Sequence, residues 1–207
     1  MKKSIKEYLL PYVITLKIPT VTRISLNLVL RRQFKRLKPG KVLDVGSNIS
    51  PYKKYIPHTE YLRMDIDERT KPDICCDIHH IKWKSNYFDI VIATEVLEHL
   101  YEPQRAVNEI YRVLKPGGVC ILSTRFIYPY HPLPEDHYRF TRDSLSYLFR
   151  KFSKVEIYPH GNRLQAIWEM INSGKIRIFL NVFNPIIARI NFKDEKFPCG
   201  FVVWAQK

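Results

Sequence analysis

Short apolar runs alternate with stretches of helical period along most of the chain. Runs rich in β-branched and aromatic residues lie at residues 41–45, 61–66, 88–93, 119–124, 155–158 and 201–205, with a weaker one near 74–77. Runs of this length and composition predict β-strands. The pattern therefore predicts a sheet of seven strands.

Two stretches between these runs have the apolar spacing of amphipathic helices. Residues 106–114 place apolar side chains three and four apart and stop at the sequence KPGG. Thr141 has the position of a helix N-cap, and Leu145, Leu148 and Phe149 form an apolar stripe after it. Strands that alternate with helices predict an α/β fold, in which helices cover both faces of a mostly parallel sheet.

Residues 164–190 interrupt this alternation. They hold two apolar stripes at helical spacing between the sixth and seventh strands. We expect a helical insertion at about residues 164–197 that forms a lid or cap. The predicted organisation is a basic helical region over residues 1–38 and one α/β domain over residues 39–207, because a chain of 207 residues is most often a single domain.

Positive charge is concentrated at the N-terminus. The chain has 34 Lys and Arg against 20 Asp and Glu, a formal net charge of +14, and residues 1–38 hold ten basic residues and one acid. Leu26, Leu30, Phe34 and Leu37 form a helical stripe flanked by arginines in this region. Such a helix suits an anionic surface, so we predict peripheral association with an anionic membrane. The alternative is a helix that packs this stripe on the sheet and leaves a solvated basic face.

The remaining composition favours a cytoplasmic protein, with the inner face of the membrane as a place of peripheral association. The four cysteines have no C-x-x-C spacing, which favours reduced structural thiols. Prolines and a lysine interrupt the apolar stretch of residues 1–21 and no small-residue cleavage site follows, so we expect no signal peptide. No run approaches the ~20 apolar residues of a membrane-spanning helix.

The sequence PGKVLDVGSNISPYKKYI, residues 39–56, has the order of a nucleotide-cofactor turn but few glycines. Gly46 keeps the first glycine position, and Asn48 stands at the second, where Asn tolerates a left-handed backbone. Ser50 and Pro51 have the pattern of an N-cap and a first helical residue. We therefore predict that the turn is preserved and leads straight into a helix.

Two acids follow the expected ends of the first two strands. Asp65 lies nineteen residues beyond Gly46, where an acid accepts hydrogen bonds from ribose hydroxyls. Asp44 can accept from amides of the turn or from an ammonium group of the ligand. The alternative for both acids is capping of the strand ends.

Four motifs in one order resemble a known family, the class I S-adenosylmethionine-dependent methyltransferases, and its small type 11-like members in particular. LDVGSNIS resembles the D-x-G-x-G-x-G cofactor loop with two glycines replaced, and DICCDIHHIKWKSNYFDIVIATEVLEHL resembles the next block. RVLKPGG and the closing FVVWAQK complete a match over about residues 39–158 and the C-terminus. The resemblance implies a Rossmann-like fold with an antiparallel last strand and S-adenosylmethionine as cofactor.

The resemblance also implies the residues of the cofactor site. Adenine is expected at Asp77 and Ile78, and the other positions lie at the ends of the first, second and fourth strands. The predicted cofactor residues are Asp44, Gly46, Ser47, Asn48, Asp65, Ile66, Asp77, Ile78, Thr94 and Glu95.

The acceptor side is predicted from the stretch YPYHPLPEDHYRFT, residues 128–141, which resembles members associated with surface polysaccharide and lipid-linked sugar biosynthesis. His131 and His137 are the first candidates for the catalytic base, and Glu95 and His99, four apart at an expected helix start, are the next.

The same stretch is expected to bind the acceptor through Asp136, Tyr138 and Arg139. Arg139 can grip a phosphate or carboxylate of the acceptor, or it can pair with Asp136 and fix the loop. The reaction requires no metal, and we expect none.

The function most consistent with these motifs is methyl transfer to a sugar, a lipid-linked molecule or another small molecule. RNA methylation is an alternative suggested by the basic N-terminus, but no RNP-like or zinc-finger spacing supports nucleic-acid binding. A nicotinamide dehydrogenase leaves EVLEHL and RVLKPGG without a role. A non-catalytic binding protein on the same fold is the last alternative.

Overall fold

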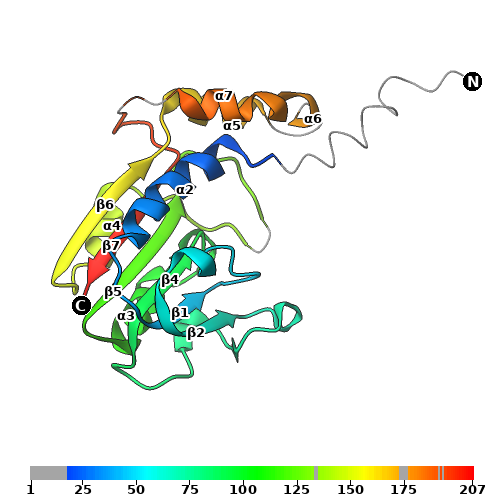
Figure 1. The fold of residues 1–207 in the computed structure, drawn as a ribbon. Helices are drawn as coiled ribbons and strands as arrows, with labels where there is room; N and C mark the ends of the chain where they lie inside the picture. The colour runs from blue at the N-terminus through cyan, green and yellow to red at the C-terminus, as the bar shows by residue number, and fades with distance from the viewer. Residues whose placement is uncertain (1–17, 133–134, 173–176, 191, 193) are drawn as a thin grey trace, which may run out of the picture.

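A computed structural model describes residues 18–132, 135–172, 177–190, 192 and 194–207, and its centre is one seven-stranded sheet (Figure 1). The strands are β1 (Gly40–Val45), β2 (His58–Asp65), β3 (Ile74–Cys75), β4 (Phe88–Thr94), β5 (Leu114–Arg125), β6 (Lys154–His160) and β7 (Gly200–Gln206). Their order is β3-β2-β1-β4-β5-β7-β6. Only β7 runs antiparallel to its neighbours, so the predicted sheet is confirmed.

The strands alternate side chains between two cores. On one face Val42, Ile92 and Trp204 pack against helix α2 (Val21–Phe34). On the other face the neighbouring strand positions pack against α3 (Pro103–Val113) and α4 (Arg142–Leu148). This alternation is the period-two pattern of extended strands, and it confirms helices on both faces.

The helix boundaries follow the sequence signals with one correction. Thr141 caps α4 as predicted, because its Oγ1 accepts a hydrogen bond from the amide of Ser144 at 3.2 Å. The KPGG sequence lies inside β5, although we predicted it as a stop before the strand. β5 begins earlier because Leu114 pairs with Phe88 across a register shift, ahead of the regular pairing that starts at Val119.

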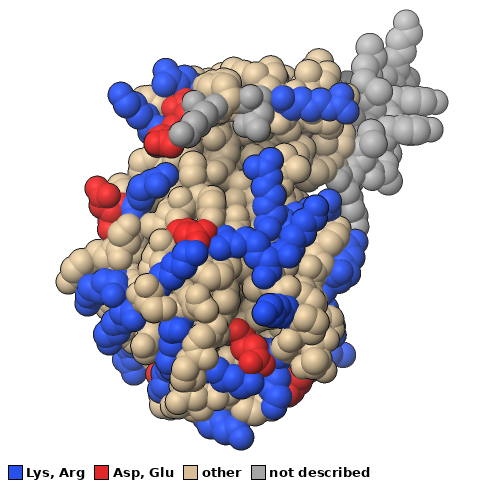
Figure 2. Space-filling model, turned by 60° about the vertical axis from the view of Figure 1, so that its left-hand side comes forward, with Lys and Arg blue, Asp and Glu red and all other residues tan. Residues whose placement is uncertain are grey.

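The N-terminal stripe packs on the sheet. Leu26, Leu30 and Phe34 are each 0–1% exposed in the core between α2 and the strands. The prediction that this stripe is an interfacial membrane surface is therefore wrong, because the sheet already covers it. On the face shown in Figure 2, basic side chains outnumber acidic ones from one end of the molecule to the other.

A helical cap lies at one end of the sheet, where residues 164–197 were expected to form an insertion (Figure 1). It consists of α5 (Arg163–Ile171), α6 (Arg177–Leu180), η6 (Asn181–Phe183) and α7 (Asn184–Arg189). Asn184 joins its parts to the N-terminal segment, accepting from Trp168 Nε1 at 2.8 Å and donating to the Pro19 carbonyl at 3.1 Å. α5 begins three residues after β6 ends, so the cap stands at the carboxyl edge of the sheet.

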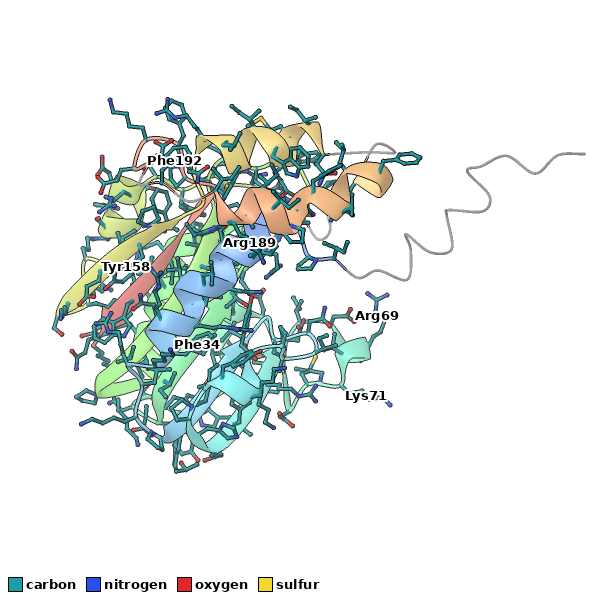
Figure 3. The ribbon with its side chains drawn as sticks, turned by 45° about the horizontal axis from the view of Figure 1, so that its top comes forward. Phe34, Arg69, Lys71, Tyr158, Arg189 and Phe192 are labelled. Carbon is teal, nitrogen blue, oxygen red and sulfur yellow. The ribbon has the colours of Figure 1, made fainter. Side chains whose placement is uncertain are left out.

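Four short 3₁₀ helices connect the strands: η1 (Lys53–Tyr55), η2 (Glu68–Thr70), η3 (Ile78–His80) and η4 (Leu97–His99). Arg69 and Lys71 project from the η2 loop, far from the cap segment that carries Arg189 and Phe192 (Figure 3). Within the described residues, no helix is long and apolar enough to cross a membrane.

Candidate active site

The strand order reverses between β1 and β4, and ligands of open α/β sheets bind at such a point, outside the carboxyl ends of the strands. β1, β2, β4 and β5 are parallel, so their carboxyl ends share one edge. Asp65 and Thr94 end β2 and β4, and the turn that begins at Gly46 follows β1. The topology therefore places the predicted cofactor residues at one edge.

The turn after β1 has left-handed backbone at each position where the family pattern has glycine. Gly46, Asn48 and Ser50 have φ of 61°, 43° and 49°. A Cβ on Gly46 would meet Cγ2 of Val96 at 2.5 Å, which explains why this glycine remains. Asn tolerates this conformation better than most residues, so the prediction for Asn48 is confirmed.

Ser50 is not the N-cap that we predicted. Its amide donates to the Ser47 carbonyl at 2.6 Å, which closes a tight turn, and the chain then forms only the short η1 helix. Serine has no special tolerance of a left-handed backbone, so this position holds local strain. The turn is preserved in backbone shape, but it does not lead straight into an α-helix.

Asp65 holds this turn in place. Its Oδ2 accepts from the Asn48 amide at 2.9 Å, and its Oδ1 accepts from the Asp67 amide at 3.0 Å. The Ser47 amide adds a bond to the Met64 carbonyl at 3.1 Å. Each carboxylate oxygen has two lone pairs, so Asp65 keeps acceptor capacity for ribose hydroxyls while it orders the loop.

Asp44 is buried behind the turn, with 4% of its surface exposed. Its Oδ2 accepts from the Tyr61 hydroxyl at 2.7 Å. Burial raises the pKa of Asp44 to about 6, although the Tyr61 hydrogen bond acts in the opposite direction. Sequence reasoning missed Tyr61, because its role depends on the β1–β2 register that sets Tyr61 beside Val42.

The remaining cofactor positions lie along the same edge. Asp77 follows β3 and accepts from the His79 amide at 2.8 Å, and Ile78 beside it is buried. Ile66 follows Asp65 with 69% of its surface exposed, an apolar face available to a ligand. Thr94 is half-buried at the end of β4. The roles of these residues toward adenine and ribose stay predictions.

Glu95 does not stand at the start of an α-helix. It occupies a corner with φ of 58°, η4 follows it, and α3 begins only at Pro103. Its side chain forms a buried ion pair with Arg125 and accepts from Ser123 Oγ at 2.9 Å. Burial opposes ionisation, but the Arg125 charge outweighs it and holds the pKa of Glu95 below its usual range. Glu95 is thus engaged within the protein, which disfavours it as the base.

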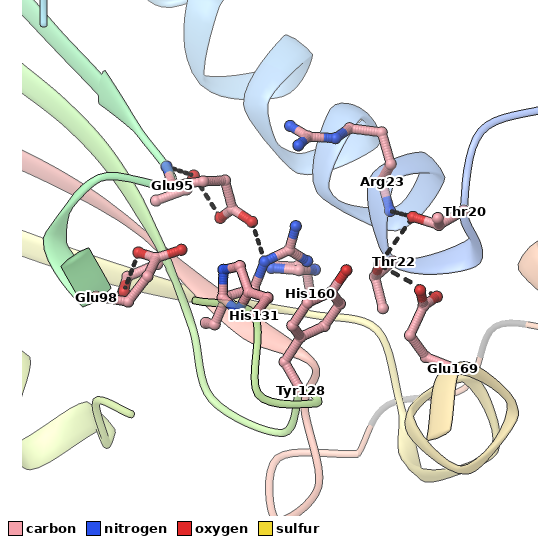
Figure 4. A network of polar contacts seen from close by, with 12 residues as sticks. Thr20, Thr22, Arg23, Glu95, Glu98, Tyr128, His131, His160 and Glu169 are labelled. Atoms are coloured by element: carbon pink, nitrogen blue, oxygen red, sulfur yellow. Dashed lines mark hydrogen bonds and ion pairs between the residues drawn. The ribbon is translucent and has the colours of Figure 1, made fainter. Parts of the chain in front are cut away.

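A second buried acid, Glu98, extends this network (Figure 4). Its Oε2 accepts from Thr124 Oγ1 at 2.8 Å. Burial, together with the charge of Glu95, raises the pKa of Glu98 to about 8. On the cap side Thr22 of α2 donates to Glu169 of α5 at 3.3 Å. The sequence alone did not reveal these buried acids, since their partners lie far apart in the chain.

The loop after β5 folds back over η4. The amides of His137 and Tyr138 donate to the Glu98 carbonyl at 2.8 and 3.2 Å, and the His99 Nδ1 lies 2.5 Å from the Glu135 carbonyl. His131 and His99 come together as a pair of rings with centroids 4.9 Å apart. The predicted acceptor loop therefore lies beside the carboxyl end of β4.

Arg139 fixes this loop. It pairs bidentately with Asp136 at 2.5 and 2.6 Å and donates to the carbonyls of Tyr128 and Pro129. Its hydrogen bonds hold the pKa of Asp136 well below its usual range. These contacts favour the alternative in which Arg139 orders the loop over the one in which it grips an acceptor anion.

The two predicted bases differ in their surroundings. Burial lowers the pKa of His131, against the pull of Asp136, so its imidazole is neutral at pH 7 and can accept a proton. His137 is exposed, and its Nε2 lies 2.9 Å from Glu135 Oε2. His131 is therefore the better placed of the two.

Comparison with known proteins agrees with this geometry. A family model described as "Methyltransferase domain" matches residues 43–122, which span β1 to β5. Ubiquinone/menaquinone biosynthesis C-methyltransferase UbiE of Burkholderia cenocepacia (strain HI2424) is 25% identical over 183 residues, covering 73% of this chain and 74% of that protein.

Solved structures share the fold. A SAM-dependent methyltransferase from Archaeoglobus fulgidus has a TM-score of 0.59 at 17% identity, covering 95% of this chain and 99% of that one. Phosphoethanolamine N-methyltransferase 2 of Haemonchus contortus, solved with S-adenosyl-L-methionine, has a TM-score of 0.59 at 14% identity, covering 88% and 52%. The fold and the cofactor edge define a class I methyltransferase that uses S-adenosylmethionine. Within that class, the matched domain is similar to the type 11 methyltransferase domain over residues 43–122.

Proposed function

We propose that this methyltransferase acts on a lipid-linked small molecule, such as a lipid-linked sugar of surface polysaccharide synthesis. The observation that carries the proposal is the exposed apolar surface of the cap, which stands at the sheet edge where the acceptor must enter. The names of two related proteins, UbiE and the phosphoethanolamine N-methyltransferase, describe small-molecule acceptors and support this class.

The cap exposes large apolar side chains along its described helices. Ile167 and Ile171 of α5 are 52% and 56% exposed, Val182 of η6 is 57% exposed, and Ile186 of α7 is 58% exposed. Large apolar side chains gathered on one exposed segment are typical of a site that binds a lipid or a partner. An apolar acceptor chain fits it.

The chemistry assigned to the protein is proton removal and orientation, while the cofactor supplies an electrophilic methyl group. His131 accepts the proton of an acceptor hydroxyl, because its neutral imidazole lies in the loop beside the carboxyl end of β4. Loss of a positioned base typically lowers turnover ~10²- to 10⁴-fold. We expect His131→Ala to show this loss with unchanged affinity for S-adenosylhomocysteine, and His137→Ala to lose less.

The acceptor class is tested with S-adenosylmethionine that carries a radioactive methyl group. The protein is incubated with a total bacterial lipid extract, with water-soluble sugar nucleotides, and with RNA, and the label in each fraction is counted. We expect label in the organic phase, and a product mass increased by one methyl group. Label confined to RNA or to the water-soluble fraction would reject the lipid-linked acceptor, and cofactor binding without any transfer would support the non-catalytic alternative.

The same surface favours peripheral membrane association through the cap. Exposed Arg177, Arg189 and Lys196 lie on the cap segment beside its apolar side chains, a combination that suits anionic lipid. In flotation with anionic vesicles at low salt we expect binding that Ile171→Glu combined with Ile186→Glu removes. Tyr147→Glu, a change at an equally exposed site on α4, is the matched control. Equal flotation of all three proteins would exclude the cap as the membrane surface.

A further inference from the structure

Three side chains with metal-binding atoms converge beside the acceptor loop. Glu98, His99 and His131 each offer one potential ligand atom, and these three atoms all lie within 4.8 Å of one another. Glu98 and His99 belong to η4, whereas His131 comes from the loop after β5. The two imidazoles meet at an interplanar angle of 74°, so they converge without stacking face to face.

Glu98 has an oxygen that the protein leaves without a donor. The residue is 0% exposed, its Oε2 accepts from Thr124, and its buried Oε1 has no hydrogen-bond partner among the described residues. A buried polar atom of this kind is costly, and in native proteins it usually has a partner, a water molecule or an ion. Arg125, whose positive charge acts on Glu98, is already paired with Glu95.

One of the two imidazoles is oriented by the loop. His99 Nδ1 lies 2.5 Å from the Glu135 carbonyl, to which it donates, so its Nε2 carries the lone pair. Histidines that bind metals almost always have their other ring nitrogen held by a carbonyl or carboxylate, as His99 has. His131 Nδ1 lies 3.2 Å from Asp136 Oδ2 but is buried without a hydrogen-bond partner among the described residues.

We propose that Glu98, His99 and His131 bind one divalent transition-metal cation of the Zn²⁺ class. Two imidazole nitrogens and one carboxylate suit Zn²⁺, Co²⁺, Mn²⁺ or Fe²⁺, whereas Mg²⁺ and Ca²⁺ prefer oxygen ligands alone. Three protein ligands leave at least one coordination position open. This site departs from the expectation of a metal-free reaction.

The position of the cation gives it a role that rests on the proposed function. Beside the acceptor loop it would polarise an acceptor oxygen and lower the pKa of a hydroxyl there. With the cation bound, His131 would be a ligand in place of the base assigned to it above, the proton would pass to solvent, and the loss of turnover expected for His131→Ala would come from loss of the cation. Metal binding itself does not depend on which acceptor the enzyme uses.

The test is a Co²⁺ titration of the full chain, free of any affinity tag and treated with a chelator. We expect visible absorption bands of protein-bound Co²⁺ that saturate at one equivalent, that Zn²⁺ abolishes, and that excess Mg²⁺ leaves unchanged. His99→Ala and His131→Ala should each weaken Co²⁺ binding by more than about 10-fold. A loss of about 10-fold is already typical when only a residue that supports a metal ligand is removed, so loss of a ligand itself should exceed it. His80→Ala and His137→Ala, exposed histidines outside the site, should bind Co²⁺ as the parent does.

Circular dichroism and titration with S-adenosylhomocysteine confirm that each variant is folded. Absence of saturable bands in the parent, or equal binding by all four variants, would overturn the metal site. Neither result would affect the acceptor assignment, which the labelling experiment decides. Loss of Co²⁺ bands together with label still entering the lipid fraction would show methyl transfer without this metal.

Discussion

The cofactor edge and the acceptor side of this protein are built by different physical means. Around the turn after β1, backbone turn geometry and hydrogen bonds to the end of the neighbouring strand position the chain, as in the bond from the Asn48 amide to Asp65. Around η4 and the loop after β5, buried charges from separate segments meet, as in the pair of Glu95 with Arg125. The cofactor side is thus specified by a turn and one strand pairing, and the acceptor side by buried charges.

This difference determines which amino-acid substitutions each region tolerates. A local turn keeps its shape when one glycine is replaced, provided that the new residue accepts a left-handed backbone. A buried charge network does not tolerate the loss of one member, because the remaining charge is left without compensation in a medium of low polarity.

The largest expected effect is on the acceptor side. Arg125→Met removes the partner of Glu95 and leaves two acids, Glu95 and Glu98, buried close together. We expect a loss of about 3 to 5 kcal/mol in the free energy of unfolding, measured by urea denaturation. Arg69→Met removes an exposed pair with Asp67 and should cost less than about 1 kcal/mol. A similar small loss for both variants would contradict the role of the buried network.

The next largest effect is a dependence of stability on pH, caused by Asp44 at the cofactor edge. Because burial raises the pKa of Asp44 to about 6, above its value in the unfolded chain, its contribution to stability is complete below about pH 4 and is lost as pH rises through 6. Between pH 4 and pH 7 the parent should therefore lose about 1 to 3 kcal/mol relative to Asp44→Asn. Urea midpoints of both proteins at several pH values measure this difference, and parallel curves would show that Asp44 ionises normally.

The smallest effect sharpens the description of the turn. Ser50→Gly removes the cost of a left-handed serine, but it adds flexibility to the unfolded chain. We expect a net gain of less than about 1 kcal/mol and unchanged or slightly tighter binding of S-adenosylhomocysteine. Gly46→Ala is a control that should lower the stability of the protein, because the added Cβ would clash with Val96. Destabilisation by Ser50→Gly would mean that the serine side chain, rather than the backbone, maintains the turn.

Sequence predicted where the residues of the cofactor edge lie, because each of them follows directly after a strand run. The structure brings the turn after β1 and the acid after β2 to one edge, although Asn48 and Asp65 are seventeen residues apart in the chain. Ser50 was misassigned because an N-cap pattern and a left-handed turn use the same residue types. The role of Tyr61 could not be predicted from the sequence, because its hydrogen bond to Asp44 depends on the register between β1 and β2.

The loop after β5 lies beside the carboxyl end of β4, where sequence placed it, but its contacts were not predicted, and its role toward the acceptor stays a prediction. The proline-rich loop and its histidines were identified, yet the burial of Glu98 and its approach to His131 depend on how η4 and the loop pack together. The same limit applies to the N-terminal stripe, where helical spacing cannot distinguish a membrane surface from the sheet beneath α2. Long-range packing decided both outcomes.

The central claim, that this glycine-poor turn is a working cofactor site organised by Asp65, is tested most directly by calorimetric titration of S-adenosylhomocysteine into the parent and Asp65→Ala. The account predicts saturable binding at one site in the parent and a loss of about 1 to 3 kcal/mol in the variant, from hydrogen bonds to the ribose and to the Asn48 amide. Equal affinity of the two proteins, or no binding by the parent, would contradict it.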